Sequence, residues 1–380
     1  MPWRTTDVLT ERGRFCVRLE QGERMVDLCR EYGISRTTGH KFWKRYQQSG
    51  LSALEDHSRR AWTFPHRTPK EIVALVVAAR KKHPTWGPKK LKVVLEQRHP
   101  TLKIPAHSTI GDILTNAGMV KPRRGRRKAT YTPSDQLTAA SAPNEVWCID
   151  FKGQFRLGNG NYCYPLTITD LYSRYVIGVT ALEGIHAAQT AAAMDLVFSE
   201  YGLPTIIRSD NGTPFASAGL LGFSSLNVWW ARLGIQHQRI QPGKPQQNGQ
   251  HERMHRTLKA ETTKPPCHNI LQQQAAFDRW RHTFNRHRPH EALGQKTPAS
   301  IFKASATPYP DFLDDPQYAL CDEVKTIGRG GHLRFNNKSF YISKALATQD
   351  IGIVYQSHPV VALYFIDQHI GHINNDRFET

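Results

Sequence analysis

Apolar residues recur at helical spacing through the first part of the chain. The spacing predicts helices over residues 8–22, 25–32 and 36–46. Gly33 lies where a tight turn requires a positive φ, and Ser35 suits the N-cap of the helix that follows. A helix, a turn and a second helix at this spacing are typical of a helix-turn-helix, whose second helix enters the major groove of DNA.

The second helix of this motif carries polar and basic residues in its first half. We predict that they reach DNA, and the candidates are Arg36, Thr37, His40, Lys41 and Lys44. The alternative is a small helical bundle with a solvated basic face. The turn chemistry and the charge together favour DNA binding.

A second helical segment follows, with predicted helices over residues 69–82, 89–97 and 108–118. The motif His83-Pro84-Thr85-Trp86-Gly87-Pro88 separates the first two. Ile110, Ile113 and Leu114 predict a packed core for the last helix.

The middle of the chain alternates between the two kinds of periodicity. Strand patterns occur at 145–152, 161–169, 174–180, 205–208 and 235–240, and helix patterns at 186–201, 224–233, 248–263 and 270–287. This order predicts an α/β domain with a mixed sheet. After residue 310 the pattern becomes β-rich over 323–373, which predicts a small β-barrel.

Charge divides the chain unevenly. The net charge is +19, and residues 1–140 hold 28 lysines and arginines against 12 acidic residues. A basic run at 121–128 contains Arg123, Arg124, Arg126 and Arg127, which cannot all be buried. We interpret it as a linker that also follows DNA phosphates, since each neutralised phosphate releases counterions.

Other classes of protein find little support. No apolar run approaches the roughly 18 residues of a membrane span, and the start of the chain does not resemble a signal peptide, so we expect a cytoplasmic protein without membrane contact. The six cysteines include no Cys-x-x-Cys pair, which disfavours a disulfide framework or a structural zinc site.

Three acidic residues lie on or next to predicted strands and helices of the α/β segment. Asp150 follows apolar residues of a predicted strand, Asp210 follows a second strand, and Glu252 lies on a predicted helix. An acid among apolar neighbours is costly unless its charge is compensated. Mg²⁺ prefers oxygen ligands, and two such ions can assist phosphoryl transfer.

These motifs resemble the acidic triad of DDE-type insertion-sequence transposases with a retroviral integrase-like core. The matching words are Trp147-Cys148-Ile149-Asp150-Phe151, Thr169-Asp170-Leu171-Tyr172-Ser173-Arg174, Ser209-Asp210-Asn211-Gly212, Gln247-Asn248-Gly249-Gln250-His251-Glu252-Arg253 and Arg288-Pro289-His290-Glu291-Ala292-Leu293. One departure is the separation of Asp210 and Glu252, which is a few residues longer than in the family. The loop at 216–222 accommodates the extra length.

The resemblance implies a ribonuclease H-like core that holds two Mg²⁺ ions, or Mn²⁺ in their place, on Asp150, Asp210 and Glu252. It implies that Asn211, Asn248 and Arg256 support the site and that Lys259 holds a DNA phosphate. The helical segment before the core resembles a second helix-turn-helix, in which His107, Ser108 and Thr109 would lead the DNA-reading helix. The alternative is a purely structural role for that helix.

A multidomain protein is therefore expected. It has helix-turn-helix units at 1–60 and 68–120, a basic linker at 121–143, a catalytic core at 144–305 and a β-rich domain at 320–380. The function implied is cleavage of the terminal inverted repeats of a mobile element and joining of the 3′-hydroxyls to target double-stranded DNA, by a dimer or tetramer in the bacterial cytosol or nucleoid. A catalytically inactive regulator and a structure-selective nuclease of the same fold are the alternatives.

Overall fold

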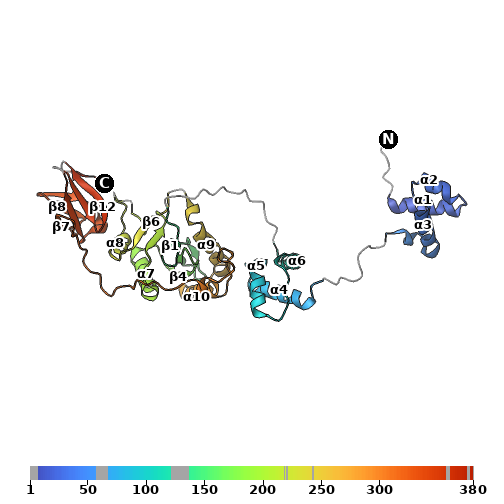
Figure 1. Ribbon diagram of the computed structural model, residues 1–380, viewed down its shortest axis with the longest axis horizontal. Helices are drawn as coiled ribbons and strands as arrows, with labels where there is room; N and C mark the ends of the chain where they lie inside the picture. Colours follow the sequence, from blue (N-terminus) through green and yellow to red (C-terminus); the bar gives the residue numbers. More distant parts are fainter. Residues whose placement is uncertain are drawn as a thin grey trace. The chain divides into compact units, whose positions relative to one another are not determined.

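The computed structural model describes residues 7–56, 67–120, 137–217, 219, 221–241, 244–356, 360–374 and 377–379. The chain divides into two compact units, Met1–Arg67 and Thr68–Thr380, whose elements are labelled in Figure 1. Each helix and strand predicted individually is present, and the observed ends differ from the predicted ones by a few residues. The basic run with Arg123, Arg124, Arg126 and Arg127 lies outside the described residues.

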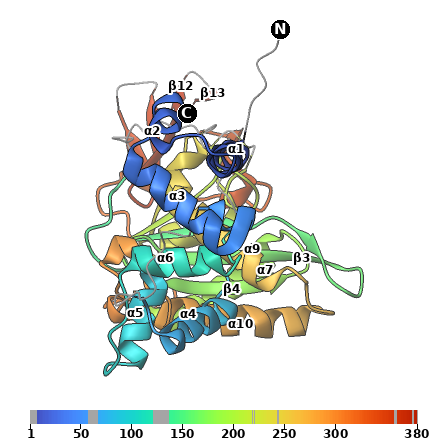
Figure 2. The same ribbon diagram turned by 90° about the vertical axis from the view of Figure 1, so that its right-hand side faces the viewer.

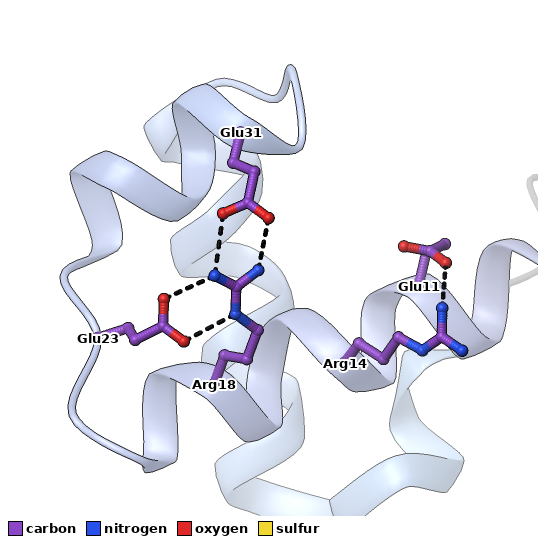
Figure 3. A network of polar contacts seen from close by, with 5 residues as sticks. All are labelled: Glu11, Arg14, Arg18, Glu23 and Glu31. Atoms are coloured by element: carbon purple, nitrogen blue, oxygen red, sulfur yellow. Dashed lines mark hydrogen bonds and ion pairs between the residues drawn. The ribbon is translucent and has the colours of Figure 1, made fainter.

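The first unit consists of three helices, α1 (Val8–Glu20), α2 (Met25–Glu31) and α3 (Arg36–Ser49), followed by a 3₁₀ turn at Gly50–Leu54. Its core is made by the buried residues Phe15, Cys16, Leu28, Cys29 and Leu54. Arg18 of α1 donates hydrogen bonds to the carboxylates of Glu23 and Glu31, which ties α1 to the loop and helix that follow (Figure 3).

The turn between α2 and α3 has the predicted chemistry. Gly33 has a φ of 61°, a left-handed conformation that glycine adopts at little cost. The Ser35 hydroxyl accepts a hydrogen bond from the backbone N–H of Thr38 at 3.2 Å and so caps α3. Gly39 lets α3 approach the rest of the core, because a Cβ there would lie 2.7 Å from Cys29 Sγ and 2.9 Å from Met25 Sδ.

The second unit begins with three helices, α4 (Lys70–Lys82), α5 (Pro88–Arg98) and α6 (His107–Asn116). They enclose a small apolar core that includes Trp86, Leu91 and Ile110. The start of α5 contacts the α/β core. Lys90 Nζ donates to the carbonyl oxygen of Pro289 at 2.7 Å, and Lys89 forms an ion pair with Glu291.

The α/β core is built on a mixed sheet. Its strands are β1 (Val146–Phe151), β2 (Phe155–Arg156), β3 (Tyr162–Asp170), β4 (Val176–Leu182), β5 (Ile206–Ser209) and β6 (Gln236–Arg239). β3 pairs antiparallel with β1, β2 and β4, whereas β1, β5 and β6 run parallel. The prediction of an α/β core with a mixed sheet is confirmed.

Helices cover both faces of this sheet. Alternate residues of the strands face α7 (Ala187–Tyr201) and α8 (Ser225–Arg232), which bury the largest apolar cluster. The other residues face α9 (Gly249–Thr262) and α10 (Ile270–Arg286). α10 runs along β4 (Figure 2), and its Gln274, Arg281 and Asn285 side chains hydrogen-bond to the β4 backbone. The edge of β4 is thus covered, which removes a free edge for pairing with another chain.

The C-terminal part forms two open sheets. One contains β7 (Glu323–Thr326), β10 (Asp350–Tyr355), β11 (Val361–Phe365), β12 (Gln368–Asn374) and β13 (Arg377–Glu379), and the other is the hairpin of β8 (His332–Phe335) and β9 (Lys338–Tyr341). The predicted small β-barrel is therefore not confirmed. The apolar face of the larger sheet is buried against the hairpin and against Val228 of α8, so closure is not needed to cover it.

Gly39→Ala is expected to lower the stability of the first unit by about 1–3 kcal/mol, because the new methyl group overpacks the contact between α3 and α2. Thr37→Ala, on the exposed side of the same helix, should leave stability unchanged or slightly higher because alanine favours helix. Hydrogen exchange of amides within residues 7–56 of the full chain measures both effects. Equal protection in the two variants would contradict the packing argument.

Candidate active site

Asp150 and Asp210 come to the same edge of the sheet through parallel pairing. β1 and β5 pair in register, with Cys148 opposite Arg208. Two residues further along each strand stand Asp150, the fifth residue of β1, and Asp210, which directly follows β5. Strand alternation puts both on the sheet face opposite α7, since Ile149 and Ile207 belong to the cluster that packs against α7.

Glu252 approaches from the first turn of α9, which covers that face. Its side chain is exposed, whereas Asp150 and Asp210 are half-buried. The backbone N–H of Gly212 donates to Asp210 Oδ1 at 3.1 Å, and a Cβ on Gly212 would lie 3.1 Å from Asp210 Oδ2. The glycine thus lets the loop pass close to the carboxylate.

The charges of the three acids act on one another. Burial raises the pKa of Asp150 to about 7, with further contributions from the negative charge of Asp210 and, to a smaller extent, of Glu252. The N–H of Phe151 and the charge of Lys152 act in the opposite direction. A raised carboxyl pKa is the signature of negative charge that the protein leaves largely uncompensated, and a bound cation would compensate it.

Polar side chains lie directly beneath Asp150. Thr167, which pairs with Asp150 across β1 and β3, contacts the Nε2 atoms of His251 and His255 at 2.7 Å each. Thr169 contacts His251 Nδ1 at 2.8 Å. Both histidines are buried, and burial lowers the pKa of His251 to about 3 and lowers that of His255 as well. The histidines are therefore neutral, and one ligand atom each of Asp150, His251 and His255 lies within 4.8 Å of the others.

Comparison with protein families places this site within a known domain. The family described as "Integrase core domain" matches residues 140–245, and a second family with the same description matches residues 233–298. The two matched segments contain Asp150, Asp210 and Glu252 and are continuous across the sheet and α9. The chain contains an integrase core.

Helix-turn-helix families match the part of the chain before the integrase core. A "Helix-turn-helix domain" matches residues 13–61, and a "Homeodomain-like domain" matches residues 38–114. The recognised family, an integrase core preceded by helix-turn-helix domains, is confirmed.

Several proteins are similar over most of the chain. The insertion element IS407 uncharacterized 31.7 kDa protein of Burkholderia multivorans is 27% identical over 72% of this chain and 88% of its own length. The insertion element IS476 uncharacterized 39.2 kDa protein of Xanthomonas euvesicatoria is 25% identical over 74% of this chain and 79% of its own length. The Gag-Pol polyprotein of baboon endogenous virus is 28% identical over 72% of this chain, which corresponds to 16% of the polyprotein.

Solved structures give weaker similarities. The HTLV-2 integrase catalytic core domain in complex with magnesium is 19% identical, with a TM-score of 0.35, over 43% of this chain and all of that chain. A chain in the structure of the simian T-cell lymphotropic virus intasome in complex with PP2A regulatory subunit B56 gamma is 14% identical, with a TM-score of 0.39, over 78% of this chain and 97% of that chain.

The residues predicted to support the site lie on different sides of it. Asn211 donates from Nδ2 to the carbonyl oxygen of Ile240 at 2.7 Å and so fastens the loop after β5. Asn248 is buried just before α9, and its Oδ1 has no hydrogen-bond partner among the described residues. Arg256 and Lys259 are exposed and follow Glu252 at helical spacing, so the three share the outward face of α9.

The predicted DNA-contact residues of the helical domains lie on exposed surfaces. Arg36, Thr37, His40, Lys41 and Lys44 are all exposed on α3, on the side away from its core. His107 and Ser108 are exposed at the start of α6, and Thr109 is half-buried. Ile110 and Leu114 of α6 are buried, so that helix has a packed side and a free N-terminal end. The contacts of these residues with DNA stay predictions.

The polar layer of Thr167, Thr169, His251 and His255 was not predicted from the sequence. His255 is buried against the sheet with His251, Met254 and Leu258 rather than exposed with Glu252. Two signals in the sequence could have identified the layer. Thr167 and Thr169 recur at strand spacing, and His251 and His255 recur at helical spacing, so each pair shares one face.

Asp170 has a structural environment. It is 1% exposed and accepts hydrogen bonds from the backbone N–H groups of Asn144 and Ser173 at 2.8 and 2.7 Å, and from the Ser173 hydroxyl at 2.6 Å. It pairs with Trp147, three residues before Asp150, and so lies towards the opposite end of β1. These hydrogen bonds cap the turn that follows β3.

Two matched substitutions are expected to change stability in opposite directions. Burial also raises the pKa of Asp170, but its carboxylate accepts three hydrogen bonds that act in the opposite direction. Asp170→Asn places an amide N–H₂ against these donors and should cost about 1–3 kcal/mol, because the unpaired donors outweigh the removal of a buried charge. Asp150→Asn should raise the free energy of unfolding at pH 8 without divalent cations. The pKa of Asp150 is higher in the folded protein than in the unfolded chain, so its ionised carboxylate destabilises the fold at a pH above both values. Urea denaturation in chelator at pH 8 measures both. Destabilisation by Asp150→Asn would show that its charge is compensated within the protein.

Proposed function

We propose that this integrase-core protein is a transposase that binds the ends of a mobile DNA element, cuts them to give 3′-hydroxyls and joins these to target DNA. The observation that carries the proposal is the parallel register of β1 and β5, which brings Asp150 and Asp210 together under Glu252 of α9. Three carboxylates at one open edge of a sheet suit phosphoryl transfer assisted by divalent ions. The similar proteins of IS407 and IS476 are insertion-element proteins, which is consistent with the proposal.

The donor set fits divalent cations. Carboxylate oxygens are the ligands that Mg²⁺ prefers, and Mn²⁺ accepts the same ligands. The raised pKa of Asp150 provides the electrostatic reason for such a cation to bind. When bound, two ions would polarise the attacking and leaving oxygens of the phosphate. Asp150, Asp210 and Glu252 would hold them, and Asn211 and Asn248 would fix the loop and helix start that carry Asp210 and Glu252.

The DNA would be held by separate surfaces of the chain. On the core, Arg256 and Lys259 extend from the same face of α9 as Glu252, where each could hold a backbone phosphate. The exposed residues of α3 and the start of α6 would read the element ends, and the arginines at 123–127 would follow DNA phosphates. Since both ends must be held together, the active form would be a dimer or a tetramer in the cytoplasm.

Two other functions are compatible with the same fold. A catalytically inactive regulator would need the helix-turn-helix units but not the three acids. A structure-selective nuclease would need the acids but not the sequence-reading helices. The chain combines both sets, which favours the transposase. Among the described residues, no helix has the length and apolar character needed to cross a membrane.

Glu252→Gln is expected to lower the rates of strand cleavage and strand transfer together, each by roughly 10²–10³-fold or more, because one site performs both steps. Binding of element-end DNA should be unchanged, because it is assigned to the helical domains. The measurement uses labelled DNA from the inverted repeats that flank the gene, with Mg²⁺ or Mn²⁺. Asp170→Asn is the matched control and should retain cleavage while folded. Near-normal cleavage by the Glu252 variant would exclude the proposed acids.

Arg36→Ala is expected to reduce preference for element-end DNA by about 1–3 kcal/mol if Arg36 contacts a base. The affinity for unrelated DNA should change little. The measurement is the binding constant on both DNAs over a range of salt concentrations. An equal loss on both, with a salt slope smaller by about one, would instead make Arg36 a phosphate contact.

A further inference from the structure

The hydrogen bonds beneath Asp150 determine which histidine nitrogens carry protons. The Thr167 hydroxyl has three partners: the carbonyl oxygen of Asp150 at 2.9 Å and the Nε2 atoms of His251 and His255 at 2.7 Å each. A hydroxyl has one proton to donate and two lone pairs that accept. A carbonyl oxygen only accepts, so the Thr167 hydroxyl donates its proton to the backbone carbonyl oxygen of Asp150. Both Nε2 atoms must therefore carry protons and donate to Thr167.

The two histidines then differ at Nδ1. His251 Nδ1 is an acceptor, and the Thr169 hydroxyl donates to it at 2.8 Å, so both nitrogens of His251 are used. Among the described residues, no hydroxyl or N–H group donates to His255 Nδ1, which faces Asp150 Oδ2 at 3.8 Å. This separation exceeds the 2.7–3.2 Å range of an N–H···O hydrogen bond, so no proton is shared between the two atoms. A neutral imidazole carries one ring proton, and that of His255 is on Nε2, so Nδ1 presents a lone pair to the carboxylate oxygen.

Two electron-pair donors that face each other without a proton suit a cation between them. Two ligand atoms bound about 2.1 Å from one ion lie about 3–4.2 Å apart, depending on the angle between them. The 3.8 Å from His255 Nδ1 to Asp150 Oδ2 falls in this range. His255 is buried, and the hydrogen bond from its Nε2 fixes the ring orientation, as in known histidine metal ligands.

We propose that His255 Nδ1 is a metal ligand that shares one divalent ion with Asp150. The proposal rests on the proposed function, because it places the ion on the acid that function requires. Imidazole nitrogen favours first-row transition ions, whereas Mg²⁺ prefers oxygen. The site on Asp150 is therefore a mixed nitrogen–oxygen site that selects a transition ion such as Mn²⁺ over Mg²⁺. His251, whose ligand atom lies within 4.8 Å of those of Asp150 and His255, holds the network and does not bind the ion.

Pulsed electron paramagnetic resonance of Mn²⁺ bound to the full chain without DNA tests the proposal. A directly bound histidine couples its ¹⁴N nucleus to the electron spin of Mn²⁺. We expect this ¹⁴N signal in the wild-type protein, and labelling of the histidines with ¹⁵N should replace it by a ¹⁵N signal. The labelled wild-type protein needs no substitution, so the result does not depend on the folding of a variant.

Two matched substitutions identify the histidine. His255→Gln places its amide N–H₂ near the position of Nε2 and so keeps a donor for Thr167, but it lacks Nδ1. It should remove the ¹⁴N signal and weaken Mn²⁺ binding about tenfold, with little change for Mg²⁺. His251→Gln should keep the signal. If wild-type Mn²⁺ gives no histidine signal, or if the signal survives His255→Gln, the proposal is wrong.

Asp150→Asn separates this proposal from the proposed function. It should remove the tightly bound Mn²⁺, because both the proposed function and the proposed His255 ligand require Asp150 to bind the ion. Mn²⁺ binding that depends on Asp150 but shows no histidine signal would overturn the assignment of His255 as a ligand and leave the proposed acidic site unaffected. Mn²⁺ binding unchanged by Asp150→Asn would place the ion elsewhere and overturn both.

Discussion

The repulsion among carboxylates at one edge of the sheet is the constraint on which the rest of the site depends. The parallel pairing of β1 and β5 brings Asp150 beside Asp210, and α9 adds Glu252. Folding must bury Asp150 and hold these like charges together, so its pKa is raised by burial first and by the charge of Asp210 second. The apolar packing of the sheet against α7 and α8 stabilises the pairing, so a rigid core holds an unfavourable group of charges.

The face of the sheet that α9 covers is organised differently from the apolar face that packs against α7 and α8. Where α9 passes Asp150, it presents His251 and His255 to Thr167 and Thr169 instead of apolar side chains. A buried polar network of this kind orients its members because each lost hydrogen bond leaves an unpaired group. The network fixes the start of α9, and therefore Glu252, relative to the strand that carries Asp150. Further along the same helix, Met254 and Leu258 return to ordinary apolar packing.

The family motif at Arg288 to Leu293 acquires a physical meaning from the fold. Arg288 pairs with Glu261 of α9 at 3.4 Å, while Pro289 and Glu291 receive Lys90 and Lys89 from the start of α5. The segment thus joins the end of α9 to the start of α5. In the proposed function, such contacts would transmit the position of a DNA end bound by the helical domain to the acids.

The sequence by itself determined the elements and the α/β class, and it predicted the three acids of the proposed site, because periodicity, turn residues and motifs are local properties of the chain. The capping of α3 by Ser35 and the turn at Gly33 follow from adjacent residues. Only the tertiary structure decided which side of α9 faces the sheet, since both His255 and Lys259 fit a polar helix face until the sheet occupies one side. It also decided that the C-terminal sheets stay open, because the hairpin and Val228 of α8, which is distant in the sequence, cover the apolar face of the larger sheet. These outcomes depend on contacts between distant segments, which no local pattern encodes.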